Sequence, residues 1–343
     1  MCQGNVQRGF HVDARKGRIA LEGHISGSAS GAIADGYSLA ESGGEVVLDL
    51  SGIEHIDISG INELIKLELR SRSHGRRLVA AGAGSELADI FRATCIDEAI
   101  PVQADASEKG GAAYDKAKIS AWAKPVERIT LHEVPEGAIN LNVEGRRVTG
   151  PMQGFGQLWE KTFRVRLAGV NASPRDVMKA FKENFTGIQP PQNRFFPTSA
   201  GIAPGEVVLI NAHTPAGLIC TGVWVVYSDE EAFTLMTPQG HPESGWVSFS
   251  AFEDEGCTCA QVQAFARAGD PVFELGFHLM GSREHERIWT RVLESLAALF
   301  GVPGWVRMHK TCVGPDLQWN HLQNVFYNAQ VRTMLSSFRR ALS

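Results

Sequence analysis

His241 and Glu243 stand two residues apart in a segment, residues 237–246, that is framed by glycine and proline. An imidazole and a carboxylate at this spacing could act as an acid–base pair or as two metal ligands. The alternative is a rigid turn, in which Pro238 and Pro242 fix the backbone and the histidine ring hydrogen-bonds to it. The sequence favours the turn and keeps the acid–base pair as the second hypothesis.

Other reactive side chains give weaker signals. Cys257 and Cys259 lie on one face of an expected strand, but no second pair of ligands follows at zinc-finger spacing. The chain also has no nucleophile elbow, no Walker A loop and no zinc-binding HExxH helix. We therefore predict no metal site and no cofactor. No catalytic residue is assigned, and the sequence favours a role other than catalysis without deciding the question.

A second candidate site lies in the first third of the chain, at Asp57, Ile58, Ser59 and Gly60. Helical spacing of apolar residues predicts a helix that starts here, with Ser59 as its N-cap. The alternative to a simple cap is a phosphorylated serine, because a phosphate would meet the free N–H groups at the helix start. The added charge beside Asp57 would change the local surface, as a binding switch requires.

Aromatic residues crowd the second half of the chain, and most of them must form ordinary core. A curved sheet around one helix commonly encloses an apolar cavity, however, and such a cavity binds small hydrophobic ligands. The residues expected to line a pocket of this kind are Phe163, Trp224, Phe233, Trp246, Phe249 and Phe265, together with His241 and Glu243.

The first third of the chain is expected to be an α/β domain with a partly parallel sheet, because strands and helices alternate there. The expected strands cover residues 18–22, 45–50, 77–81 and 99–102. The expected helices cover residues 29–40, 59–73 and 85–94. A polar, small-residue stretch at 103–113 indicates a linker, and residues 113–123 and 138–148 suggest a short helix and one or two strands.

The second half is expected to be an α+β domain in which an antiparallel meander grips a long helix. Ser173 and Pro174 open a first helix with a good cap. The expected strands cover residues 162–167, 206–210, 219–227, 232–236, 246–252 and 258–265. Helical spacing of apolar residues predicts a long helix over 282–300 and a further helix over 322–342.

Composition excludes several functional classes. The chain has 343 residues, which predicts two or three domains, and its formal net charge is −5. A mildly acidic chain is a poor candidate for a general nucleic-acid binder or a polybasic peripheral membrane protein. No segment reaches the roughly 18 apolar residues of a membrane span. The six cysteines are too few for a disulfide framework, so we expect a cytoplasmic protein.

Residues 10–102 resemble a STAS domain, the module of bacterial anti-sigma factor antagonists and of sulfate-transporter tails. The matching segments are residues 46–53, 56–61 and 75–82, in the same order as in that family. The resemblance implies that Ser59 is the site that a partner kinase phosphorylates. It also implies that Asp57, Ile58, Ser59 and Gly60 form a docking surface for a protein partner of the anti-sigma factor or kinase type.

Residues 155–300 are similar to an uncharacterised domain family of bacteria and plants that is related to the START-like helix-grip superfamily. The similarity is carried by residues 240–245, the strand around Phe249 and residues 261–267. Members of that superfamily bind lipids, sterols or polyketides, and some are enzymes. The resemblance therefore implies an apolar small molecule or lipid as ligand, but transfers no catalytic residue.

These observations predict a STAS-like regulatory domain over 1–103, a linker and irregular segment over 104–150, a START-like helix-grip domain over 151–301 and a helical extension over 302–343. The predicted function is that of a cytoplasmic regulatory protein of anti-sigma factor antagonist type. Its first domain docks a protein and its second binds an apolar small molecule. The alternatives are an enzyme acting on a hydrophobic substrate in the C-terminal pocket and a lipid-handling accessory protein.

Overall fold

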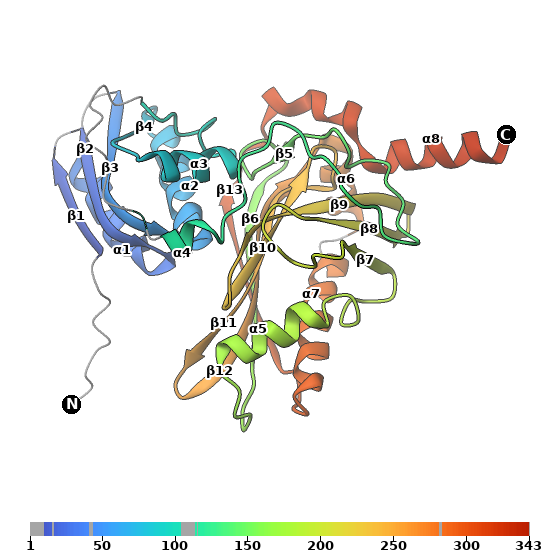
Figure 1. Cartoon of the computed structure of the whole chain (residues 1–343). Helices are drawn as coiled ribbons and strands as arrows, with labels where there is room; N and C mark the ends of the chain where they lie inside the picture. The colour runs from blue at the N-terminus through green and yellow to red at the C-terminus, as the bar shows by residue number, and fades with distance from the viewer. Residues whose placement is uncertain are drawn as a thin grey trace. The chain divides into compact units, whose positions relative to one another are not determined.

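The computed structural model describes residues 10–15, 17–40, 44–103, 114, 116–280 and 283–342. The chain divides into two compact units, Met1–Pro125 and Val126–Ser343, each described separately below (Figure 1). Most of the expected linker, residues 104–113, and Ser282 at the expected start of the long helix lie outside the described residues.

The N-terminal unit is built on a four-stranded sheet in the order β1-β2-β3-β4. Strand β1 pairs antiparallel with β2, whereas β2–β3 and β3–β4 are parallel. The strands are β1 (Phe10–Arg15), β2 (Arg18–Ile25), β3 (Glu45–Ile56) and β4 (Arg77–Ala81). The helical elements are η1 (Gly27–Ala29), α1 (Ser30–Ala40), α2 (Ile58–Ser73), α3 (Ser85–Ala93) and α4 (Lys116–Ile119).

The expected alternation of strands and helices in this unit is confirmed, as is the partly parallel sheet. Strand β3 is longer than expected, and the strand expected over 99–102 is reduced to one bridge between Ala80 and Val102. Strand β1 was not predicted, because its residues are half-buried or exposed and its apolar signal is weak. The helix expected over 113–123 is confined to one turn, α4.

The C-terminal unit is a nine-stranded antiparallel sheet in the order β13-β6-β12-β11-β10-β9-β8-β7, with β5 pairing with β10. Its strands are β5 (Val148–Thr149), β6 (Leu158–Arg166), β7 (Asn193–Pro197), β8 (Val207–Thr214), β9 (Gly217–Ser228), β10 (Ala232–Pro238), β11 (Glu243–Asp254), β12 (Cys257–Ala268) and β13 (Val306–Gly314). Its helical elements are α5 (Pro174–Glu183), α6 (Pro271–Met280), α7 (Arg283–Leu299), η2 (Trp319–Tyr327) and α8 (Ala329–Leu342).

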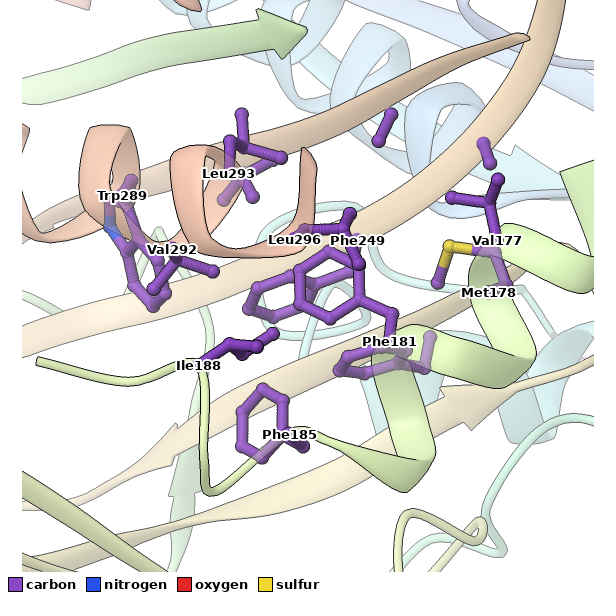
Figure 2. Close-up of a cluster of buried hydrophobic side chains, with 14 of the residues drawn as sticks. Val177, Met178, Phe181, Phe185, Ile188, Phe249, Trp289, Val292, Leu293 and Leu296 are labelled. Atoms are coloured by element: carbon purple, nitrogen blue, oxygen red, sulfur yellow. The ribbon is translucent and has the colours of Figure 1, made fainter. Parts of the chain in front are cut away.

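The core of this unit lies between the sheet and the helices α5 and α7. Figure 2 shows Phe249 of the sheet between Phe181 of α5 and Leu296 of α7. The ring of Phe249 stacks on Phe233 at 4.4 Å between centroids and meets Phe181 edge-on at 5.2 Å. Helix α5 begins at a capping box between Ser173 and Asp176, as the sequence predicts. The expected helix-grip architecture, a meander packed around a long helix, is confirmed.

Several elements of the C-terminal unit were not predicted, namely β7, α6 and β13. The helix expected over 322–342 is divided, because Asn328 leaves the helical conformation (φ −48°, ψ 117°). Its side-chain NH₂ group donates to Asp270, and its side-chain oxygen Oδ1 accepts from the Val331 N–H, so Asn328 starts a new helix. Over the described ranges, no helix is both long and apolar enough to cross a membrane.

Candidate functional site

Helix α2 begins one residue earlier than the sequence predicts, and its N-cap is Asp57. The Asp57 carboxylate accepts a hydrogen bond from the Gly60 N–H at 2.7 Å, and Asp57 has an extended backbone (φ −104°, ψ 177°). The prediction that Ser59 is the N-cap is therefore wrong. Aspartate and serine are comparable caps, so residue type alone does not show which of the two caps the helix.

The hydroxyl of Ser59 is consequently not used for capping. Ser59 is half-buried, and its Oγ atom makes no hydrogen bond to any residue that the structure describes. Ile58 and Gly60 are buried. A side chain on Gly60 would meet the Ile25 carbonyl oxygen at 2.4 Å, so the start of α2 packs directly on the end of β2. Of the four residues expected to dock a partner, Asp57 and Ser59 are the ones that reach the surface.

Tyr114 is distant from this turn in the sequence, but the fold brings its side chain to the end of β3. Its hydroxyl accepts a hydrogen bond from the Ile56 N–H at 2.7 Å and lies 3.4 Å from Nδ1 of His55. Burial, together with the nearby charge of Asp57, raises the pKa of Tyr114 well above its usual range, so the group stays neutral. The residue thus fixes the strand end immediately before Asp57.

The capping assignment predicts different costs for two alanine substitutions in this turn. Asp57→Ala should lower the free energy of unfolding by about 1 kcal/mol, because the Gly60 N–H loses its acceptor. Ser59→Ala should cost clearly less, because no hydrogen bond of Oγ to a described residue is lost. Denaturant unfolding of both variants checks this, and an equal loss in both would restore Ser59 as a capping residue.

A cavity of about 140 Å³ lies in the C-terminal unit, against the same face of the sheet that holds the core. Strands β6, β12 and β13, the start of β11 and helix α6 supply its walls. Its lining residues are Gln157, Trp159, Lys161, Glu243, Ala264, Ala266, Arg267, Ala268, Glu274, Phe277, His278 and Lys310.

The room in the cavity comes from small side chains on strand β12. Every second residue of a strand faces the same side, and the core residues Ala260 and Val262 are followed on that face by Ala264, Ala266 and Ala268. Opposite them on β6, Ala266 pairs with Trp159 and Ala264 pairs with Lys161. The alanine series therefore leaves a space beside a tryptophan and a lysine.

Positive charge gathers on one wall of the cavity. Lys161 and Lys310 are register partners on β6 and β13, and Lys161 is buried. Both approach the same carboxylate, Glu286 of α7, at 4.0 Å from Lys161 and 3.0 Å from Lys310. Because two ammonium groups share this one carboxylate, the wall keeps a net positive character.

Carboxylates also line the cavity, and one of them is held in place by its neighbours. Glu274 of α6 is mostly buried and accepts from the Gln157 N–H at 3.4 Å. It also pairs with His278 one turn later, at 3.2 Å. A side chain on Gly156 would overlap the Glu274 carboxylate, so the glycine is needed to admit it.

His241 and Glu243 have different roles in the structure. The Nδ1 atom of His241 lies 3.0 Å from both the backbone N and the backbone O of Glu243 and accepts that N–H. The ring thus closes a turn on the backbone, as the rigid-turn hypothesis expects. Glu243 lines the cavity, whereas His241 is outside its lining. The Nδ1 atom is therefore engaged by the Glu243 backbone.

The six aromatic candidates lie outside the lining of this cavity. Phe163, Phe233 and Phe249 belong to the core cluster, and they fill the part of the grip where a ligand was expected. Trp246 and Phe265 stack on each other across β11 and β12 at 6.2 Å. The remaining candidate, Trp224, donates its indole N–H to the Gly205 carbonyl at 3.0 Å.

Sequence reasoning missed the residues that do line the cavity, apart from Glu243. The alternate alanines of β12 were a usable signal, because small residues on the inward face of a strand leave a space. Lys310 and Glu274 could not be assigned, since β13 and α6 were not predicted. Among the residues that the structure describes, no three His, Cys, Asp or Glu side chains are grouped to hold a metal ion.

Comparison with known families identifies the first unit. Residues 10–102 match the family model described as Mlab, STAS domain. These residues form a STAS domain. In the second unit, residues 161–293 match the model of a domain of unknown function, DUF1990. No curated protein matches the chain in sequence.

Solved structures resemble part of the chain at low identity. The di-domain ARO/CYC StfQ from the steffimycin biosynthetic pathway has 11% identity and a TM-score of 0.33, covering 42% of this chain and 51% of its own. The present chain thus spans about half the length of StfQ. Protein Ms6760 from Mycobacterium smegmatis has 14% identity and a TM-score of 0.30, with coverages of 41% and 90%. Ara h 8.0201 has 14% identity and a TM-score of 0.30, with coverages of 41% and 97%.

Proposed function

We propose that this chain is a regulatory protein in which the C-terminal unit binds a small amphiphilic molecule and the STAS domain docks a protein partner. The observation that carries the proposal is the cavity that Trp159 lines together with alanines of β12, two lysines and two carboxylates. Small-molecule sites combine an apolar body with a few placed polar groups in this way.

The size of the cavity limits the ligand. A cavity of about 150 Å³ can hold a molecule the size of benzene, and this one has a volume of about 140 Å³. It therefore suits a ring-sized group better than a whole lipid or sterol. The indole of Trp159 and the ring of Phe277 offer apolar surface to such a group.

The charges on the walls indicate which polar group the ligand carries. Lys161 and Lys310 share Glu286 and retain positive charge toward the cavity, which favours an anionic ligand group such as a carboxylate. Glu243, on the carboxylate side, can accept a hydrogen bond from a hydroxyl or amine of the same molecule. The ligand class we propose is thus a small planar molecule with an acidic group.

Native mass spectrometry of the purified protein tests the proposal, because it reports the mass of whatever remains bound. We expect a copurified molecule of small mass that is released on denaturation. The same mass in Glu243→Ala, which removes a carboxylate that lines the cavity, would support a binding module, and a different mass in that variant would support the enzyme alternative. Protein that is empty in every preparation, and that binds no planar acid from a panel of aromatic carboxylates, would overturn the proposal.

The STAS domain supplies the second part of the proposal, a phosphorylation-sensitive docking surface of the anti-sigma factor antagonist type. Its support is the half-buried Ser59 hydroxyl beside the Asp57 cap at the start of α2. A phosphate here would stand next to a carboxylate and would add negative charge to the surface that docks the partner.

Ser59→Asp should therefore weaken the capture of the partner by about 1–3 kcal/mol. Ser59→Ala is the matched control, because it removes the same hydroxyl without adding charge. The measurement is parallel capture from a cell lysate by the immobilised wild type and both variants, followed by titration of the retained protein. Equal affinity of the wild type and the Asp variant would remove the switch from the proposal.

A second candidate function is lipid handling, because the helix-grip superfamily that residues 155–300 resemble includes lipid-binding members. The volume of the cavity opposes a whole lipid as its occupant. A phospholipid mass in the native spectrum would nevertheless decide for this alternative, and a ring-sized acid would decide against it.

A further inference from the structure

Helix α8 exposes an apolar stripe. Val331, Met334, Leu335 and Phe338 are 45%, 45%, 55% and 63% exposed, respectively. Their spacing of i, i+3, i+4 and i+7 places them on one face of the helix. Figure 1 shows α8 extending away from the sheet of the C-terminal unit. The stripe is thus a continuous apolar surface rather than scattered side chains.

The fold fixes the direction in which this stripe faces. The first turns of α8 bury Ala329 and Thr333 on the other side of the helix. The Thr333 hydroxyl accepts from the Cys220 N–H at 3.1 Å, and the Gln330 side chain donates to the Leu218 carbonyl at 3.2 Å. Because these bonds hold α8 against strand β9, the exposed stripe follows from the packing of the helix.

The charged residues of helix α8 itself are all basic. Helix α8 contains Arg332, Arg339 and Arg340 and no acidic residue. Arg332, near the start of the helix, acts on the charge of Arg146. Burial, together with the positive charges of Arg332 and Arg128, lowers the pKa of the Arg146 guanidinium. Repulsion within a cluster of like charges is unfavourable in the free protein, and an anionic partner relieves this repulsion.

We propose that α8 binds an anionic lipid bilayer, with the stripe of Val331, Met334, Leu335 and Phe338 inserted at the level of the headgroups. Amphipathic helices with arginine beside the apolar face and no acid bind membranes in this way. The mild net charge of the whole chain, −5, does not oppose this, because the positive charge is local. A second copy of the chain is a poorer occupant, since pairing two identical stripes would bring their arginines together.

Vesicle sedimentation of the full chain tests the proposal. The probes are vesicles of phosphatidylcholine alone and of phosphatidylcholine mixed with phosphatidylglycerol. We expect binding to the mixed vesicles that weakens as salt is added, because part of the attraction is electrostatic. Phe338→Glu should reduce binding about tenfold or more, since it removes one buried aromatic side chain from the apolar phase.

Ser337→Glu is the matched control, because it adds the same charge at an exposed neighbouring position outside the stripe. It should retain clearly more binding than Phe338→Glu, and circular dichroism confirms that both variants are folded. The proposal is overturned if wild type fails to bind mixed vesicles at low salt, or if both variants lose binding equally. A dimer that only Phe338→Glu dissociates, without vesicle binding, would assign the stripe to a second copy and would likewise overturn it.

Discussion

Replacing Phe249 by alanine should lower the free energy of unfolding of the C-terminal unit by about 3–5 kcal/mol, the range for removing a fully buried aromatic ring. The ring touches both helices of the grip. It stacks on Phe233, meets Phe181 and Phe185 edge-on, and lies 5.5 Å from Trp289 of α7. Its loss leaves a space that α5 and α7 cannot both close.

Thermal unfolding monitored by calorimetry measures this effect. The two units have separate cores, so the transition of the C-terminal unit should shift to lower temperature while that of the STAS domain stays in place. Phe326→Ala is the matched control, because the same side chain is 78% exposed there and should cost little. A small shift for Phe249→Ala would show that the core can collapse around the missing ring.

The second large effect concerns the cavity, where Ala266→Trp should abolish ligand binding. Ala266 forms the cavity floor and is the register partner of Trp159 on β6. A second indole at this position would occupy the space that the ligand needs. The expected result in native mass spectrometry is protein without the copurified molecule, and a loss of affinity of about 100-fold or more for any acid that binds wild type, equivalent to about 2.7 kcal/mol.

Gln261→Trp is the matched control, because it adds the same side chain to the opposite face of strand β12, beside Arg164. It should keep the ligand. Overpacking can cost about 1–3 kcal/mol, so the melting temperature of each variant is measured alongside binding. A folded Ala266→Trp protein that still carries the ligand would place the binding site elsewhere.

The sequence predicted most of the fold because its strong signals are local. Strand β4 was expected at the residues where it forms, and the capping box at Ser173 marked the start of α5. The same local signals misplaced the cap of α2 by two residues, from Asp57 to Ser59. Either side chain can cap a helix, and the close packing of Gly60 on Ile25 that sets the helix start is a tertiary contact.

The candidate site was less predictable because it depends on long-range pairing. Aromatic content pointed to Phe163, Phe233 and Phe249, which the structure places in the core. Lys310 reaches the cavity only because β13 pairs with β6. The residues of β13 are largely exposed, and polar residues stand next to one another at 309–311, so no apolar alternation marked that strand in the sequence.

The position of β6 also sets the order in which the two units can fold during synthesis. On one side β6 pairs with β12 through Phe163 and Val262, and on the other with β13 through Phe163 and Met308. The ribosome must therefore deliver nearly the whole C-terminal unit before its first strands are enclosed, whereas the STAS sheet closes from neighbouring segments. Chains with such distant pairings fold slowly. We therefore expect β6 to remain without its partner strands for a long interval during synthesis. Chaperones protect a chain from aggregation in this state.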